Sequence, residues 1–180
     1  MVKIKAIAVS NSSPLIYLAK IGRLNLIKEV YGKIWIPEAV FDEAVTKAKT
    51  LHILNASLIE KAVGQWITKE SVRPEISSEY GFLDLNEKLG LGEKEALKLC
   101  KQLNVGFFIV DDKEARSIAR ILKIKPIGTC GMLIQANRLG VISAEEAEEI
   151  LDELIKNRFR IEPAVYRRIR EELKSITPKP

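Results

Sequence analysis

The residues of this sequence most able to do chemistry together are carboxylates and an amide that follow apolar runs. Asp111 and Asp112 come directly after the apolar run of residues 106–110, and Asn11 follows the apolar run of residues 4–9. Open α/β sheets gather their functional groups at the carboxyl ends of the strands. Two adjacent carboxylates repel each other, so the aspartate pair indicates a nearby cation, although a helix N-cap would account for one of the two.

Three further acids lie in segments of helical pattern. Glu43 stands beside Ala44 on an inward-facing stripe, and an exposed edge position is its alternative. Glu93 and Glu95 lie in the first turn of a helix predicted over residues 92–104, where the helix dipole alone would explain both, although helical phase places Glu93 nearer the apolar face. With the groups above, these acids form a set of oxygen ligands that favours Mg²⁺ or Mn²⁺ over zinc.

The thiol and imidazole content argues against other chemistries. The chain has two cysteines, Cys100 and Cys130, and one histidine, His52, with no zinc-binding spacing. We expect the cysteines to be small buried hydrophobic residues and His52 to lie at the surface. No glycine-rich nucleotide-binding motif occurs in the sequence.

Short apolar strands alternate with helices along most of the chain. This order predicts an α/β fold, with a parallel sheet wrapped by helices on both faces in one domain over residues 1–142. Residues 71–92 are expected to be irregular apart from one turn of helix, and residues 143–180 to form a C-terminal extension of two helices packed on the same domain. Strands are predicted over 4–9, 33–37, 66–68, 106–110 and 124–129, and helices over 14–22, 24–31, 37–49, 53–63, 92–104, 111–123 and 130–140.

The composition is that of a folded protein with an excess of positive charge. The formal net charge is +5, which is compatible with a polyanionic partner such as RNA. No window approaches the roughly 18 uninterrupted apolar residues of a membrane span, so we expect a cytoplasmic protein that has no membrane partner.

Five stretches, taken together and in order, resemble a PIN domain, the nuclease fold of VapC-type toxins. The likeness is closest to the VapC-like subgroup whose first motif reads D-S-S-P-L-I, where this chain has N-S-S-P-L-I. The stretches are NSSPLIYLAKIG (11–22), IPEAVFDEAV (36–45), GLGEKEALKLCKQLNV (90–105), FFIVDDKEAR (107–116) and IGTCGMLIQANRLGVI (127–142).

The resemblance assigns site roles by position. The first aspartate of the family falls on Asn11, and its P-x-x-V-x-x-E glutamate falls on Glu43. The next acid falls best on Glu95, with Glu93 kept open, and the last falls on Asp112, with Asp111 beside it. The resemblance implies four or five parallel strands and a Mg²⁺- or Mn²⁺-dependent ribonuclease. It also implies a toxin held by a small antitoxin, in a family whose members often form homodimers.

Asn11 leaves two hypotheses open. An asparagine in place of aspartate removes one unit of charge from the ion site but still offers a carbonyl oxygen, so the chain is either a nuclease with a modified site or a binding module that does not cut. Several polar and basic residues near the motifs are candidates for contacts with RNA, with helix capping or solvated helix faces as the alternative. They are Ser12, Ser13, Lys20, Arg23, Arg116 and Arg120.

Overall fold

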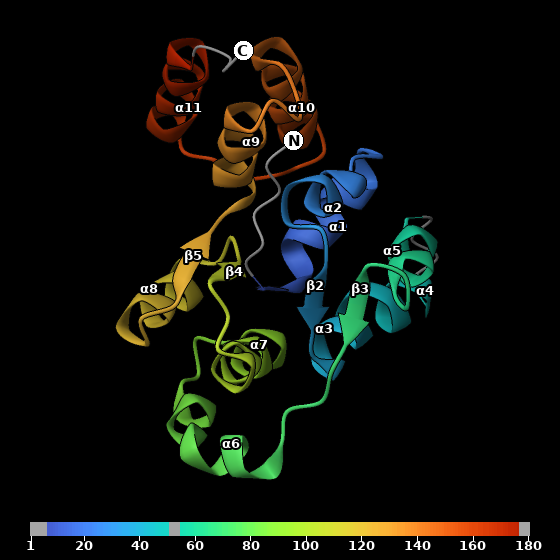
Figure 1. Ribbon diagram of the computed structural model, residues 1–180, viewed down its shortest axis with the longest axis vertical. Coiled ribbons are helices and arrows are strands. Elements are labelled where there is room, and N and C mark those ends of the chain that lie inside the picture. Colours follow the sequence, from blue (N-terminus) through green and yellow to red (C-terminus); the bar gives the residue numbers. More distant parts are fainter. Residues whose placement is uncertain (1–6, 51–54, 177–180) are drawn as a thin grey trace.

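The structure, a computed structural model, describes residues 7–50 and 55–176. Its centre is one parallel sheet of five short strands in the order β3-β2-β1-β4-β5, which confirms the predicted α/β class (Figure 1). The start of the strand predicted over residues 4–9 and the position of His52 lie outside the described residues. The strands are β1 (Ala8–Ser10), β2 (Ile34–Ile36), β3 (Ile67–Lys69), β4 (Phe107–Ile109) and β5 (Lys125–Ile127).

The order in which strands are added to the sheet reverses between the neighbouring strands β1 and β4. The chain builds outward from β1 to β2 and β3, then returns to add β4 and β5 on the other side of β1. Ser10 pairs with Ile109, and the backbone N–H of Asn11 donates to the Ile109 carbonyl oxygen at 2.9 Å. The residues that follow β1 and β4 therefore emerge side by side at the topological switch point, where open α/β sheets bind ligands.

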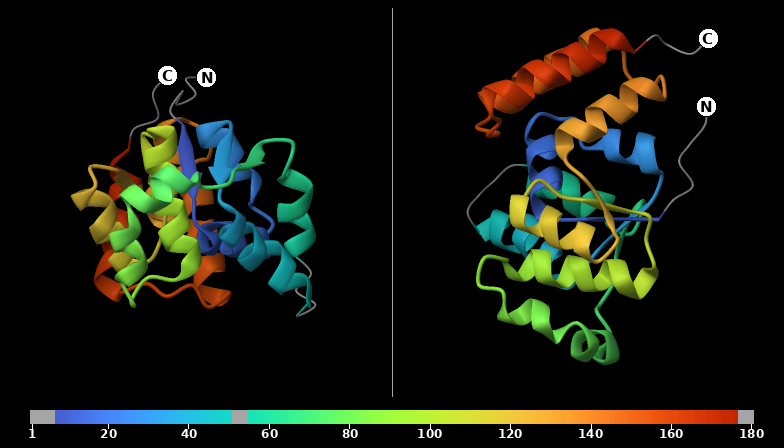
Figure 2. Two further views of the ribbon diagram at one scale, coloured as in Figure 1. Left: turned by 90° about the horizontal axis from the view of Figure 1, so that it is seen from below. Right: turned by 90° about the vertical axis from the view of Figure 1, so that its left-hand side faces the viewer.

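Helices lie on both sides of the sheet, as the alternating pattern predicts (Figure 2). Helix α7 packs on β1 and β4, and α8 packs on β5. The stretch that begins at Glu38 is divided by a π-helical turn, η1, between α3 and α4. The helical elements are α1 (Ser12–Lys20), α2 (Asn25–Tyr31), α3 (Glu38–Phe41), η1 (Asp42–Thr46), α4 (Lys47–Thr50), α5 (Ala56–Ala62), α6 (Pro74–Glu79), the 3₁₀ turn η2 (Gly81–Leu85), α7 (Leu91–Leu103), α8 (Lys113–Ile121), α9 (Thr129–Arg138), α10 (Ala144–Lys156) and α11 (Pro163–Ser175).

The segment 71–92 is more regular than its polar, glycine- and proline-rich sequence indicates. It forms α6 and η2, and η2 is tied to α7 because the Lys98 ammonium bonds both carboxylate oxygens of Asp84 at 2.8 Å. Leu83 of the same turn is buried. The Asp84–Lys98 contact joins residues 14 positions apart, so local helix propensity does not predict it.

Side-chain burial falls from the centre of the sheet to its edges. Every residue of β1 is buried, whereas β5 at the edge has an exposed Lys125. Most buried polar residues of the described ranges lie at the carboxyl ends of two strands, where buried polar groups require partners. These are Ser10 at the end of β1, Asn11 and Ser12 directly after it, and Thr129 after β5.

The C-terminal extension forms two helices, α10 and α11, as predicted. Both contact α9, and α9 in turn packs on α2. In Figure 1 the three helices α9, α10 and α11 form the upper part of the molecule, above the sheet. Across residues 7–50 and 55–176, no helix combines the length and apolar character that crossing a lipid bilayer requires.

Candidate active site

Asn11 is fully buried at the carboxyl end of β1 and its amide meets a carboxylate from α7. The Nδ2 of Asn11 donates to Oε1 of Glu93 at 2.7 Å. The other amide atom, Oδ1, is buried and has no hydrogen-bond partner within the described part of the chain. Such an unsatisfied oxygen is unusual in a folded protein and is available to a cation or to a donor.

The neighbouring Ser12 holds the second glutamate of the site. Its hydroxyl donates to Oε2 of Glu43 at 2.7 Å, and the backbone N–H of Gly92 donates to Oε1 of Glu43 at 3.2 Å. Because Gly92 is bonded to Glu93, these contacts close a ring that joins β1, α1, η1 and α7. The ring consists of Asn11, Ser12, Glu43, Gly92 and Glu93.

Local backbone features allow this close approach. Glu43 lies in the π-helical turn η1, a geometry that is frequent at functional sites. A Cβ atom at Gly92 would lie only 2.7 and 2.8 Å from the two Glu43 oxygens, and a Cβ at Gly90 would lie 2.5 Å from Oε2 of Glu93. The requirement for Gly90 and Gly92 escaped the sequence analysis, although two glycines close before Glu93, one of them adjacent to it, were a visible signal.

The carboxylate of Asp111 is held by residue 129. It accepts from the Thr129 backbone N–H at 2.7 Å and from the Thr129 hydroxyl at 2.6 Å. Burial raises the pKa of Asp111 above its ordinary value, while the bonds from Thr129 and the positive charge of Arg116 act in the opposite direction. Thr129 is also a residue that sequence reasoning missed, and its signal was a hydroxyl two residues after the last strand of the sheet.

Asp112 points to a different partner. Its side chain caps α8 by accepting from the Ala115 N–H at 2.7 Å, which confirms the N-cap explanation for one member of the aspartate pair. Asp112 is exposed and lies on the wall of the same cavity as Asp111 and Glu93.

The two acids of α7 separate in the structure. Glu93 meets Asn11, whereas Glu95 accepts from the Ala39 backbone N–H at 3.0 Å, at the start of α3. Residues two positions apart on a helix do not share a face, so only one of the two can reach Asn11. The resemblance favoured Glu95 as the site residue, but the hydrogen bond of Glu95 is to Ala39. Glu93 makes the contact with Asn11 instead.

Glu93, Asp111 and Asp112 line one end of a cavity of about 1250 Å³. Ser13 and Arg116, two of the residues predicted to contact RNA, also line it. The other four do not. Ser12 bonds Glu43, and Lys20 lies over the Tyr17 ring. Arg23 pairs with Glu146 at 2.7 Å, and Arg120 donates to the Arg116 carbonyl oxygen at 3.4 Å.

The two thiols differ in position but not in protonation. Cys100 is buried in α7, as predicted, and burial raises its pKa. Cys130 is only half-buried on the cavity wall, where desolvation and the nearby Asp111 charge raise its pKa to about 12. Both thiols are therefore protonated near neutral pH and poor nucleophiles.

The oxygen donors at this end of the cavity fit a hard divalent cation in chemical type. Among residues 7–50 and 55–176, no three acidic, histidine or cysteine side chains stand close enough together to hold a metal ion. The buried, unsatisfied Oδ1 of Asn11, on the amide whose Nδ2 donates to Glu93, is the observation that favours a cation, since carbonyl and carboxylate oxygens are the ligands that Mg²⁺ and Mn²⁺ prefer.

A parallel α/β sheet with carboxylates gathered at its switch point defines a class of proteins that bind or process ligands at that edge. Within this class, residues 7–175 match the family model DUF3368, described as a PIN domain, and the chain belongs to that family. The match spans both the sheet domain and the C-terminal helices.

Among solved structures, the chain is similar to the crystal structure of VapC20 from Mycobacterium tuberculosis, a toxin that cleaves the sarcin-ricin loop. The sequence identity is 11%, the TM-score is 0.48, and the alignment covers 62% of this chain and 94% of that chain. A comparison with curated proteins found no match.

Proposed function

We propose that this protein is a metal-dependent endoribonuclease of the VapC-like toxin type, which hydrolyses phosphodiester bonds of RNA. The observation that supports this most directly is the ring of contacts at the switch point, in which the Asn11 amide donates to Glu93 through Nδ2 and keeps a buried, unsatisfied Oδ1. Membership of the PIN domain family supports a nuclease-like function. The proposal includes a small antitoxin as partner and a homodimer as the assembled form.

Each residue of the site has a distinct role in this proposal. Asn11 Oδ1 and the carboxylates of Glu93 and Asp112 would hold the ion, with Glu43 positioned behind them by Ser12 and Gly92. When bound, Mg²⁺ or Mn²⁺ supplies activation of water and neutralises charge on the phosphate.

Two neighbouring residues keep the acidic end in place. Asp111 anchors the start of α9 through Thr129 and so holds the loops after β4 and β5 together. Glu95 is a positioning residue, because its bond to Ala39 ties α7 to the helical stretch that carries Glu43.

Glu93 and Glu95 provide a matched test of this site. We expect Glu93→Gln to abolish Mn²⁺-dependent cleavage of single-stranded RNA, because it removes the ligand charge while its amide oxygen still accepts the bond from Asn11. Glu95→Gln removes the same charge from the same helix and keeps the bond to Ala39, so it should retain most of the activity. Equal activity in both variants would show that the site is assigned incorrectly.

A specific contact also favours the second candidate, a PIN-like module that binds RNA or a protein without cutting. The Asn11 Nδ2 already donates to Oε1 of Glu93 at 2.7 Å, so this carboxylate oxygen has a hydrogen-bond partner without an ion. If the wild type is inert while Asn11→Asp cuts RNA, the binding module is the correct assignment. Cleavage by the wild type that Glu93→Gln removes supports the nuclease.

A further inference from the structure

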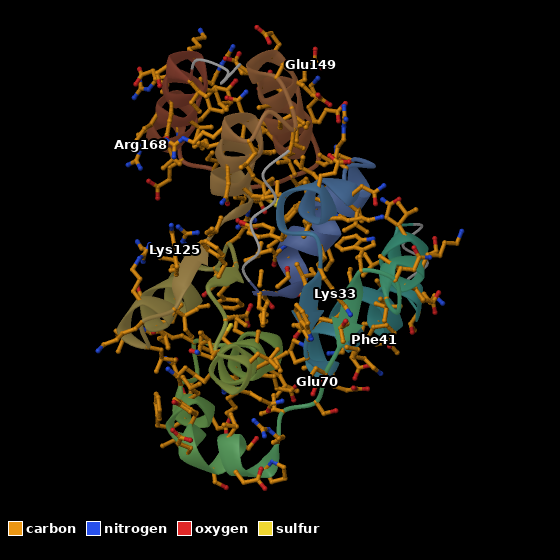
Figure 3. All side chains as sticks on the ribbon, viewed as in Figure 1. Lys33, Phe41, Glu70, Lys125, Glu149 and Arg168 are labelled. Atoms are coloured by element: carbon orange, nitrogen blue, oxygen red, sulfur yellow. The ribbon has the colours of Figure 1, made fainter. Side chains whose placement is uncertain are left out.

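The cavity that begins at the acids continues to the C-terminal extension. Its far wall is formed by β5, α9, α11 and the segment that joins α10 to α11. Figure 3 shows the labelled Lys125 and Arg168 on the same side of the molecule, on separate elements. Four cationic side chains line this wall, and they are Lys125, Arg138, Arg160 and Arg168.

Two of these four cations are available to an anionic ligand. Arg160 and Arg168 are exposed and have no ion-pair partner within residues 7–50 and 55–176. Arg138 pairs with Glu172 at 2.7 Å, and Lys125 lies 5.2 Å from the centre of the Phe107 ring. Against the four cations, the wall carries two carboxylates, Glu162 and Glu172, so its net charge is positive.

The size and lining of the cavity fit a bound polymer strand better than a small molecule. Its volume of about 1250 Å³ exceeds the roughly 300–1,000 Å³ of ordinary small-ligand pockets. Tyr17 and Phe159 also line it, as an edge-to-face pair with ring centres 5.0 Å apart. Phe159 is buried, so Tyr17 is the partly exposed ring of the pair. A positively charged wall beside an aromatic ring suits a single-stranded nucleic acid.

We infer that the C-terminal extension binds the RNA strand, with backbone phosphates on Arg160 and Arg168, and leads it along the cavity to the acidic end. Arginine suits this role because its planar guanidinium bonds two phosphate oxygens at once. The inference rests on the proposed function for the identity of the polymer as RNA. It concerns residues that the motif stretches do not include, because they lie beyond residue 142.

The chain offers a matched control for the arginines. Arg167 is next to Arg168 on α11 and is also exposed, but it lines a separate cavity together with Lys156. The test compares Arg160→Gln/Arg168→Gln with Lys156→Gln/Arg167→Gln, since each pair of changes removes two positive charges. Binding of a short fluorescent oligouridylate is measured by anisotropy in EDTA, over a range of salt concentrations.

We expect the Arg160/Arg168 variant to bind roughly tenfold or more weakly near 0.1 M salt. The slope of log K against log salt should decrease in magnitude by about 1.4, or about 0.7 for each lost phosphate contact. The control variant should keep most of the wild-type slope. Equal loss in the two variants, or no loss in either, overturns the inference.

Two further results separate this inference from its alternatives. If poly-glutamate binding, and not oligouridylate binding, depends on Arg160 and Arg168, the wall takes an acidic peptide and the inference is wrong. If oligouridylate binding depends on the two arginines but the wild type never cuts RNA with Mn²⁺, this inference is supported and the proposed ribonuclease fails. If the wild type and the Arg160/Arg168 variant bind and cleave RNA equally well, the proposed ribonuclease is supported and this inference fails.

Discussion

At the acidic end of the cavity, Glu93 and Asp111 are held by hydrogen bonds to other elements, whereas Arg160 and Arg168 at the other end are exposed and have no ion pair among the described residues. At the acidic end, hydrogen bonds of 2.6 to 2.7 Å fix the carboxylate oxygens of Glu93 and Asp111. The other end offers charge on long, free side chains.

The contrast follows from what each end has to do. A metal site or a reacting centre requires atoms fixed to a fraction of an ångström, so its side chains are held by hydrogen bonds. Attraction of a polyanion depends on charge and tolerates movement, so its residues remain in solvent. Changes at the acidic end should therefore affect stability and metal binding, while changes at the basic wall should affect RNA affinity and its salt dependence.

The largest expected effect is that of Asn11→Asp. It replaces a 2.7 Å hydrogen bond to Glu93 with the approach of two carboxylates. Without a cation, we expect the free energy of unfolding to fall by on the order of 2 kcal/mol. Mn²⁺ at about one hundred times its Kd should restore about 2.7 kcal/mol. Thermal unfolding with and without Mn²⁺ measures both effects.

Asn137 serves as the control for this change. It is also buried, with an unsatisfied Oδ1, but its Nδ2 donates to the Ile142 carbonyl oxygen at 3.1 Å and not to a carboxylate. Asn137→Asp should destabilise the protein without recovery in Mn²⁺. Recovery of both variants to the same extent would contradict a specific site at Asn11.

Gly92→Ala should have the next largest effect. The added Cβ would lie within 3 Å of both Glu43 oxygens, so Glu43 must move and its bonds to Ser12 and Gly92 are lost. We expect a loss of about 1–3 kcal/mol in unfolding free energy together with loss of Mn²⁺-dependent activity. Urea unfolding and RNA cleavage are the measurements.

Gly131→Ala is the matched change in α9, where the nearest atom to a new Cβ is at 3.5 Å. Because alanine favours a helix over glycine, this variant should gain up to about 1 kcal/mol. A comparable loss in both variants would mean that contact with Glu43 is not the cause.

The smallest effect is the pH dependence contributed by Asp111. Burial raises the pKa of its folded form above the ordinary value of 3.8, so the folded protein binds this proton more tightly than the unfolded chain. The contribution to stability is therefore greatest below the ordinary value and decreases as pH rises through the raised pKa.

Asp111→Asn can keep the bond from the Thr129 N–H and lacks this titration. Relative to the wild type, the variant should gain stability as pH increases through that window, which urea unfolding at a series of acidic to neutral pH values measures. A difference between the two proteins that does not change with pH would show that Asp111 ionises normally.

Much of the fold could be predicted from residue patterns. The run at 106–110 became β4, and the alternation of strands and helices became a parallel sheet, because both signals are local and repeated along the chain. Segment 71–92 was the main departure, since Asp84 and Lys98 stabilise it through a contact that sequence periodicity does not contain.

The sequence indicated which residues belong to the candidate site better than which side chains contact each other there. Asn11, Glu43 and the Asp111–Asp112 pair were identified from their places after strands or on a helix stripe. The choice between Glu93 and Glu95 depended on which side chain reaches Asn11, and helical phase indicated Glu93 while the resemblance indicated Glu95. Gly92 and Thr129 act through contacts with distant residues, so neither stood out as part of the site.

The sequence by itself determined the alternation of buried strands and amphipathic helices, the membership of the PIN domain family and the presence of an asparagine at position 11. Only the tertiary structure decided that Asn11 donates to Glu93, that Ser12 and Gly92 share Glu43, and that the C-terminal arginines line the cavity that begins at the acids. The reason is physical: secondary structure follows from patterns a few residues long, whereas a site is made of side chains that meet after the chain has folded back on itself.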